Sequence, residues 1–209
     1  MESKDYLKDI SEIKNMMHKS SRFISLSGLS GILAGIYALV GAIIAHRIIL
    51  DINAIEHPIK GFFAAFDAIS TLFGIAVLVV LLSIVTGIFL TVRKAKKNNA
   101  RVWDGSSKRL VINFLIPIIT GGLFCLVLID QQLFGLIAPA TLIFYGLGCI
   151  NASKYTLGDI RYLGLINVVL GLISTQFVGY GLYFWAFGFG IMHIIYGTVM
   201  YFKYDTDRK

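Results

Sequence analysis

Residues 93–109 read R-K-A-K-K-N-N-A-R-V-W-D-G-S-S-K-R and lie between two long apolar runs. This stretch holds seven of the chain's 19 lysines and arginines. Basic residues beside a membrane span resist translocation far more than acidic residues do, so such a loop stays on the cytoplasmic side. We expect it to contact lipid headgroups or a cytoplasmic partner protein through seven side chains: Arg93, Lys94, Lys96, Lys97, Arg101, Lys108 and Arg109.

The composition is that of an integral membrane protein. Of the 209 residues, 56% are hydrophobic and only 15% are charged, whereas about a quarter are charged in soluble proteins. The formal charge of +7 is confined to loops and tails, which favours a role in membrane orientation over nucleic-acid binding. Cys125 and Cys149 fall in separate apolar runs at different depths, so we expect no disulfide. We also expect no cofactor and no metal ion.

The apolar runs predict an all-α, polytopic membrane protein folded as a six-helix transmembrane bundle. The spans fall at about residues 23–46, 66–92, 110–129, 133–151, 162–179 and 181–202. Residues 1–22 form a tail with the pattern of a short amphipathic helix, and residues 203–209 form a second tail. Seventeen lysines and arginines fall in the tails and in the two loops on one side, and two fall on the other side, which predicts that both termini are cytoplasmic.

The first span carries a stripe of small residues. Small side chains let membrane helices approach closely and gain dispersion contacts, so we expect this span to be central in the bundle. The stripe includes Gly31, Ala34, Gly35, Ala38 and Ala42.

A weak internal repeat follows the predicted spans. Each odd-numbered span begins directly after an arginine, and each even-numbered span has a glycine six residues before a basic residue. Three antiparallel helical hairpins predict this pattern, as in transporters built from repeats. The preference for basic residues at cytoplasmic ends predicts part of it too, so both interpretations stay open.

Uncharged polar residues within the spans are the candidate functional groups. Ionisable residues near mid-span usually mark ion pathways, and their absence disfavours proton-coupled transport by a buried carboxylate. The polar groups either form hydrogen bonds between helices or line a cavity for a neutral or zwitterionic solute. On the fifth span, Asn167 and Ser174 share a face that must point into the bundle. The full set is Asn113, Thr120, Thr141, Tyr145, Asn167, Ser174, Gln176, His193 and Tyr196.

Three stretches resemble known families. Residues 19–42, K-S-S-R-F-I-S-L-S-G-L-S-G-I-L-A-G-I-Y-A-L-V-G-A, resemble the start of uncharacterised multi-span membrane proteins of bacteria, which implies the bacterial cytoplasmic membrane and no assigned activity. In size and predicted topology the chain looks like the S-components of energy-coupling-factor vitamin transporters, and Ala34-x3-Ala38-x3-Ala42 is similar to the alanine motif that meets their coupling subunit. Gly28-Leu29-Ser30-Gly31 resembles the G-x-S-G string of rhomboid-type intramembrane proteases.

Three functional hypotheses follow. A transport-type protein, whether permease, channel or substrate-binding subunit, predicts a polar cavity between the later spans. A membrane-embedded accessory or sensor protein predicts a tightly packed bundle that docks a cytoplasmic partner. An intramembrane serine protease predicts Ser30 and His193 within hydrogen-bonding distance. We favour transport slightly over the accessory role and both over the enzyme, with the lipid bilayer, a coupling subunit or a second copy of the chain as expected partners.

Overall fold

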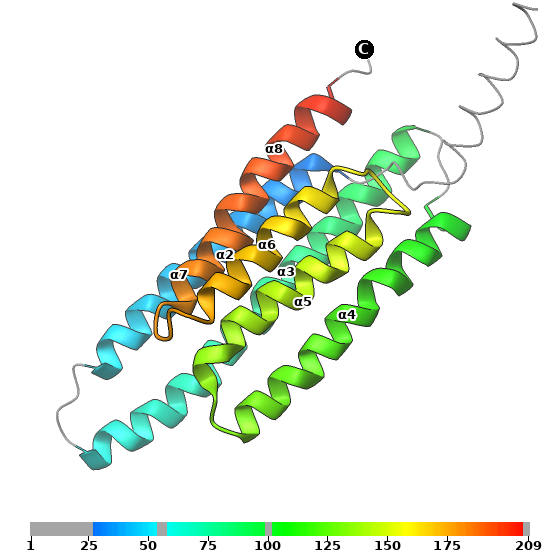
Figure 1. Ribbon diagram of the computed structural model, residues 1–209. Helices are drawn as coiled ribbons and strands as arrows, with labels where there is room; N and C mark the ends of the chain where they lie inside the picture. Colours follow the sequence, from blue (N-terminus) through cyan, green and yellow to red (C-terminus); the bar gives the residue numbers. More distant parts are fainter. Residues whose placement is uncertain (1–26, 54–57, 99–101, 207–209) are drawn as a thin grey trace, which may run out of the picture.

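The computed structural model describes residues 27–53, 58–98 and 102–206. The predicted amphipathic helix in residues 1–22 and the predicted contact residue Arg101 lie outside these ranges. In the described ranges the regular elements are all helical, which confirms the predicted all-α class (Figure 1). The elements are α2 (Gly28–Asn53), α3 (Pro58–Lys97), α4 (Gly105–Asp130), η1 (Phe134–Leu136), α5 (Ile137–Ala152), α6 (Ile160–Ser174), α7 (Gly181–Trp185), η2 (Ala186–Ile191) and α8 (Met192–Tyr204).

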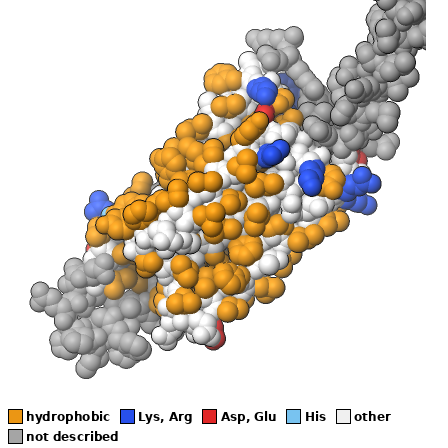
Figure 2. All heavy atoms as spheres, viewed as in Figure 1, with side chains coloured by type: hydrophobic (Ala, Val, Ile, Leu, Met, Phe, Trp, Pro, Cys, Tyr) orange, Lys and Arg blue, Asp and Glu red, His pale blue; other side chains and the backbone are white. Residues whose placement is uncertain are grey.

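The helices have the length and surface of membrane spans. In the described ranges, five helical stretches are long and apolar enough to cross a bilayer, and α6, with 15 residues, is shorter. Large apolar side chains, such as Val85 and Phe89 of α3 and Ile119 of α4, are exposed along the sides of the bundle. Figure 2 shows hydrophobic side chains over the long face of the molecule, with more basic side chains in view at one end than at the other. A lipid environment accounts for this surface, which is much more apolar than that of a soluble monomer.

Several helix boundaries differ from the predicted spans. The sequence predicts that segment 47–66 lies between spans, but α2 continues to Asn53 and α3 already begins at Pro58. The predicted fifth span runs to Gly179, but α6 ends at Ser174. Turns follow it, and the backbone of Gly179 has a φ of +97°, which a residue with a side chain rarely adopts.

Two pairs of helices pack with their backbones in direct contact. Between α2 and α8, a β-carbon placed on Gly197 would lie 2.5 Å from the backbone nitrogen of Ile32 and 2.7 Å from the carbonyl oxygen of Gly28. Between α5 and α6, β-carbons on Gly146 and Gly164 would lie 2.5 and 2.6 Å from the carbonyl oxygen of the facing glycine. Dispersion between backbones at this distance holds membrane helices together.

The small-residue stripe of the first span lies on α2 and faces its neighbours. A β-carbon on Gly31 would be 3.1 Å from the Cα of Gly197, and one on Gly35 would be 2.6 Å from the carbonyl oxygen of Gly190. Ala38 and Ala42, further along α2, are buried. Ala34 is partly exposed.

The continuous rod α7–η2–α8 joins the two close pairs. Its middle part, η2, is a six-residue π-helix, in which the backbone is wound more loosely than in an α-helix. Gly188 of η2 faces Leu142 of α5, whereas Gly190 faces Leu39 of α2. Helix α3 packs against α2, and α4 packs against α5, so these two helices flank the bundle (Figure 1).

Candidate functional site

A hydrogen-bonded pair of side chains lies beside the π-helical segment. His193 on α8 is only 7% exposed, and its Nδ1 lies 3.0 Å from the carbonyl oxygen of Gly188. Because a carbonyl can only accept, Nδ1 carries the hydrogen. In the neutral ring Nε2 is then an acceptor, and the hydroxyl of Tyr145 on α5 donates to it at 2.6 Å. Tyr145 and His193 therefore connect α5 to η2 and α8.

Asn167 on α6 also lies beside Gly188. Its side chain is completely buried, and its amide nitrogen donates to the carbonyl oxygen of Leu163 at 2.9 Å. Its Oδ1 has no hydrogen-bond partner among the described residues. A β-carbon on Gly188 would lie 2.6 Å from this oxygen, so the position is open to Asn167 only because residue 188 is glycine.

Ser174 is the second buried polar group without a partner. It lies seven residues beyond Asn167 on the same face of α6, about 10 Å along the helix axis. Its Oγ has no hydrogen-bond partner among the described residues. Leaving a buried polar atom without a hydrogen bond costs about 1–3 kcal/mol, so α6 holds two groups that destabilise the packed state.

Aromatic rings surround the Tyr145–His193 pair. Phe114 of α4 meets Tyr145 edge to face, with ring centroids 5.9 Å apart. Phe189 of η2 lies 4.9 Å from the ring of Tyr145 and 5.8 Å from that of His193. Trp185 contacts Phe189 at 5.1 Å. These contacts fix the orientation of the tyrosine and place the polar cluster in an apolar surrounding.

Most of the other predicted site residues lie apart from this cluster. Thr141 donates to its own helix at Ala138, and Tyr196 is half-buried on α8, one turn beyond His193. Three more are on exposed or half-exposed positions and bond to near neighbours in the chain: Asn113 to the Arg109 carbonyl, Thr120 to the Ile116 carbonyl, and Gln176 to the Thr175 hydroxyl. Of the nine predicted residues, Tyr145, Asn167 and His193 are therefore brought together around Gly188, a residue that the sequence pattern does not single out.

Ser30 and His193 do not form the pair that a serine protease needs. The Ser30 hydroxyl donates to the carbonyl oxygen of Ser27 at 2.6 Å. Both ring nitrogens of His193 face other groups, the carbonyl of Gly188 and the hydroxyl of Tyr145. The G-x-S-G string instead lies where α2 packs against α8, where its glycines permit the close contact.

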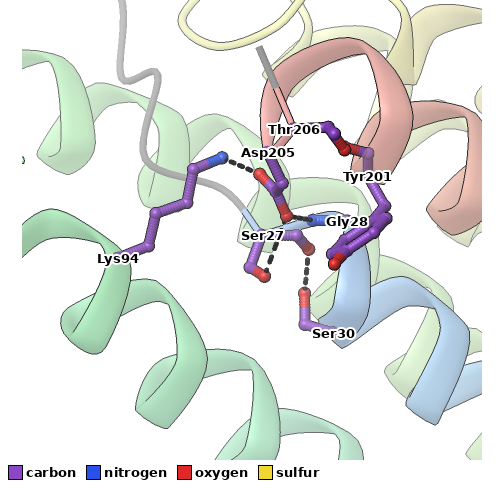
Figure 3. A network of polar contacts seen from close by, with 7 residues as sticks. All are labelled: Ser27, Gly28, Ser30, Lys94, Tyr201, Asp205 and Thr206. Atoms are coloured by element: carbon purple, nitrogen blue, oxygen red, sulfur yellow. Dashed lines mark hydrogen bonds and ion pairs between the residues drawn. The ribbon is translucent and has the colours of Figure 1, made fainter. Parts of the chain in front are cut away.

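A second polar network ties three helices together at the end of the bundle that carries residues 93–109, which we call the basic end. Asp205, directly after α8, accepts a hydrogen bond from the ammonium of Lys94 on α3, and the two side chains form an ion pair (Figure 3). The other carboxylate oxygen of Asp205 accepts from the backbone nitrogen of Gly28 at 3.1 Å and the hydroxyl of Ser27 at 3.4 Å. A carboxylate at this place also complements the positive end of the α2 dipole.

Asp159, directly before α6, is bound by two residues at the end of α8. The Lys203 ammonium lies 2.8 Å from its carboxylate, and the Tyr204 hydroxyl donates to it at 2.9 Å. The hydrogen bond from Lys203 holds the pKa of Asp159 below its usual value of 3.8, with a further contribution from Tyr204. Residues 203–205 thus connect α8 to α2, α3 and α6, and we call this set of contacts the clasp.

The predicted contact residues of the basic end fall into two groups. Lys94 belongs to the clasp, and its side chain is only 15% exposed. The remaining described ones are exposed on the last turns of α3 and the first turns of α4: Arg93, Lys96, Lys97, Lys108 and Arg109.

Comparisons with known proteins found no match among family models, curated proteins or solved structures. The described residues contain no group of three or more histidine, cysteine or acidic side chains placed to hold a metal ion. The function is therefore argued from the geometry of the polar cluster and the basic end.

Proposed function

We propose that this chain is a transport-type membrane protein, a permease, channel or substrate-binding subunit, that binds a small neutral or zwitterionic solute. The proposed site is the face of α6 that carries Asn167 and Ser174, beside the π-helical segment η2.

The observation that carries this proposal is the pair of unpartnered atoms, Asn167 Oδ1 and Ser174 Oγ. Buried polar groups almost always have hydrogen-bond partners, and a side chain that breaks this rule needs a reason. An apolar residue of similar size would avoid the cost at either position. A bound solute or a water file supplies the missing hydrogen bonds, which gives a reason for polar residues here.

The neighbouring π-helix supports the same site. Single π-helical segments inside longer helices are frequent at functional sites, because the looser winding allows local rearrangement. Gly188 touches both Asn167 and Leu142, so a small outward shift of η2 would uncover the amide oxygen of Asn167. The described cluster contains no Asp, Glu, Lys or Arg, which favours a ligand without net charge.

The clasp and Ser174 suggest the direction of entry. The clasp holds helices together at the basic end, whereas Ser174 lies near the turn between α6 and α7 at the opposite end. A solute entering from that opposite end would meet Ser174 first and Asn167 second.

Ligand-dependent thermal stability tests the proposal, with Asn167→Leu as the variant and Asn113→Leu as its matched control. Both asparagines donate to the carbonyl four residues earlier, but Asn113 lies on the outer helix α4 and is more exposed. A panel of amino acids, sugars and vitamins is screened on the purified full chain. A ligand at about 100 times its dissociation constant adds about 2.7 kcal/mol to the stability.

We expect at least one uncharged or zwitterionic compound to stabilise the wild type and Asn113→Leu but not Asn167→Leu. Asn167→Leu should itself unfold at a temperature no lower than that of Asn113→Leu, because it removes an unpartnered acceptor. A compound that stabilises all three proteins equally would refute the site, and a panel without any stabilising compound would refute the proposed function.

The accessory or sensor role remains the second candidate, and the close packing of α6 favours it. A β-carbon on Gly171 would lie 2.9 Å from the carbonyl oxygen of Pro139, so this part of the Asn167 face is closed against α5. A docking protein for a cytoplasmic partner needs no solute and predicts that Asn167→Leu keeps full function.

A further inference from the structure

The exposed cations of the basic end lie in two groups, one on the last turns of α3 and one on the first turns of α4. The two groups consist of Arg93, Lys96, Lys97, Lys108 and Arg109. Residues 98–104 connect the two groups, and seven residues of extended chain span at most about 25 Å. Figure 2 shows basic side chains gathered at this end of the molecule. We call this set of five residues the basic surface.

The described acidic residues near this surface are already engaged. Asp104 accepts a hydrogen bond from the backbone nitrogen of Ser107 at 2.7 Å and so caps α4. Asp159 and Asp205 belong to the clasp. Within the described ranges, the five cations therefore have no carboxylate left to neutralise them, and the like charges within each group repel each other.

The position of the basic surface selects the kind of anion. Large apolar side chains are exposed on α3 up to Phe89 and on α4 from Ile112, so the cations begin where the lipid-facing surface ends. Trp103, between the two groups, is 62% exposed. Tryptophan and basic residues at the ends of spans mark the level of the lipid headgroups. The anion that a membrane presents at the level of the headgroups is the lipid phosphate.

We propose that anionic phospholipids bind at the basic surface, with headgroups at the cytoplasmic-side ends of α3 and of α4. Helix α3 packs against α2 and α4 against α5, so the two helices belong to different parts of the bundle. Headgroups at each group of cations offset the repulsion within that group. Because Lys94 is paired with Asp205, it belongs to the fold and not to the lipid site. This inference does not depend on the proposed solute site.

The chain contains its own reporter for this site. Trp103 and Trp185 are its two tryptophans, and the variant Trp185→Phe leaves only Trp103. The full chain with this substitution is reconstituted in mixed vesicles of phosphatidylglycerol and phosphatidylcholine. In one preparation the phosphatidylglycerol carries brominated acyl chains, which quench nearby tryptophan, and in the other the phosphatidylcholine carries them at the same total fraction.

The test variant adds Lys96→Gln, Lys97→Gln, Lys108→Gln and Arg109→Gln, and the control adds Lys154→Gln and Arg161→Gln. Lys154 and Arg161 are exposed at the same end, on the connection to α6 and on its first turn. Each basic residue near an anionic membrane contributes about a five-fold gain in affinity. We expect brominated phosphatidylglycerol to quench Trp103 more strongly than brominated phosphatidylcholine does.

The four-fold variant should abolish this preference, and the control should keep it. Equal quenching by the two lipids in the parent protein would overturn the proposal, and would leave an acidic protein as the partner of the basic surface. A preference that survives in the four-fold variant would also overturn it, because these cations would then not be needed for lipid binding. A preference that disappears equally in the control would overturn it too, because the lipid would then respond only to overall charge.

Discussion

The contact between α2 and α8 makes Gly197→Ala a severe single-methyl change. A β-carbon at this position would lie 2.5 Å from the nitrogen of Ile32, 2.7 Å from the oxygen of Gly28 and 2.9 Å from the carbonyl carbon of Gly31. All three atoms belong to the backbone of α2, so no side-chain rotation relieves the overlap. The two helices must move apart along their whole contact.

Overpacking of a well-packed interior typically costs about 1–3 kcal/mol, and a rigid backbone neighbour places this case near the upper figure. For a chain of this size, about 3 kcal/mol lowers the melting temperature by roughly 6–12 °C. Gly87→Ala on α3 is the matched control, because a β-carbon there has no atom within 4 Å. Alanine favours a helix over glycine by up to about 1 kcal/mol, so the control should be neutral or slightly stabilised.

Thermal unfolding in a single detergent, followed by circular dichroism, compares the two variants with the wild type. The separation between Gly197→Ala and Gly87→Ala is the decisive quantity. If the two melting temperatures agree within error, α2 and α8 do not pack through their backbones, and the proposed arrangement of the bundle is wrong.

Three further changes test the polar contacts by the same assay. Asp205→Asn weakens the clasp at Lys94 and should cost about 1.5–3 kcal/mol, since hydrogen bonds to charged groups contribute this much. Tyr145→Phe leaves the Nε2 acceptor of His193 without its donor and should also cost about 1–3 kcal/mol. Because the pKa of Asp159 is lowered in the folded protein, its contribution is present above pH 3.8 and is lost as the pH falls below that value.

Matched variants identify the results that would contradict these expectations. Asp67→Asn removes an exposed acid from α3, and an equal loss in Asp205→Asn would mean that the clasp adds nothing. Tyr37→Phe removes a longer hydrogen bond, 3.3 Å to Thr86, and should cost less than Tyr145→Phe. Asp159→Asn should flatten the acid-dependent loss of stability, so an unchanged pH profile would exclude Asp159 as its source.

The helical class and the membrane environment follow from the sequence because hydropathy reports them directly. The length of α6 does not, since the apolar pattern continues past the point where the helix ends. The Thr175 hydroxyl donates to the carbonyl oxygen of Leu172, and the backbone nitrogen of Phe177 donates to the carbonyl oxygen of Ser174. These local hydrogen bonds compete with continuation of the helix. Such competition depends on geometry that a hydropathy pattern does not contain.

The candidate site was accessible from the sequence only in part. Asn167 and His193 stand out because polar groups are rare in apolar spans, but Asn113 stands out equally, and both asparagines donate to the carbonyl four residues earlier in their own helix. The contact that distinguishes them is made by Gly188, a residue without a side chain, in a π-helix that no periodicity predicts. The clasp could not be predicted from the sequence either, because its contact between Gly28 and Asp205 joins residues that are 177 positions apart in the chain.

The short α6 has a consequence for the bilayer itself. Its 15 residues span about 22 Å, whereas the hydrocarbon layer is about 30 Å thick, and the apolar stretch of α3 exceeds that thickness. We predict that lipid beside α6 thins toward the length of this helix, while α3 is accommodated by tilting. Such thinning would lower the hydrophobic barrier next to Asn167 and Ser174, on the face that we propose for the solute.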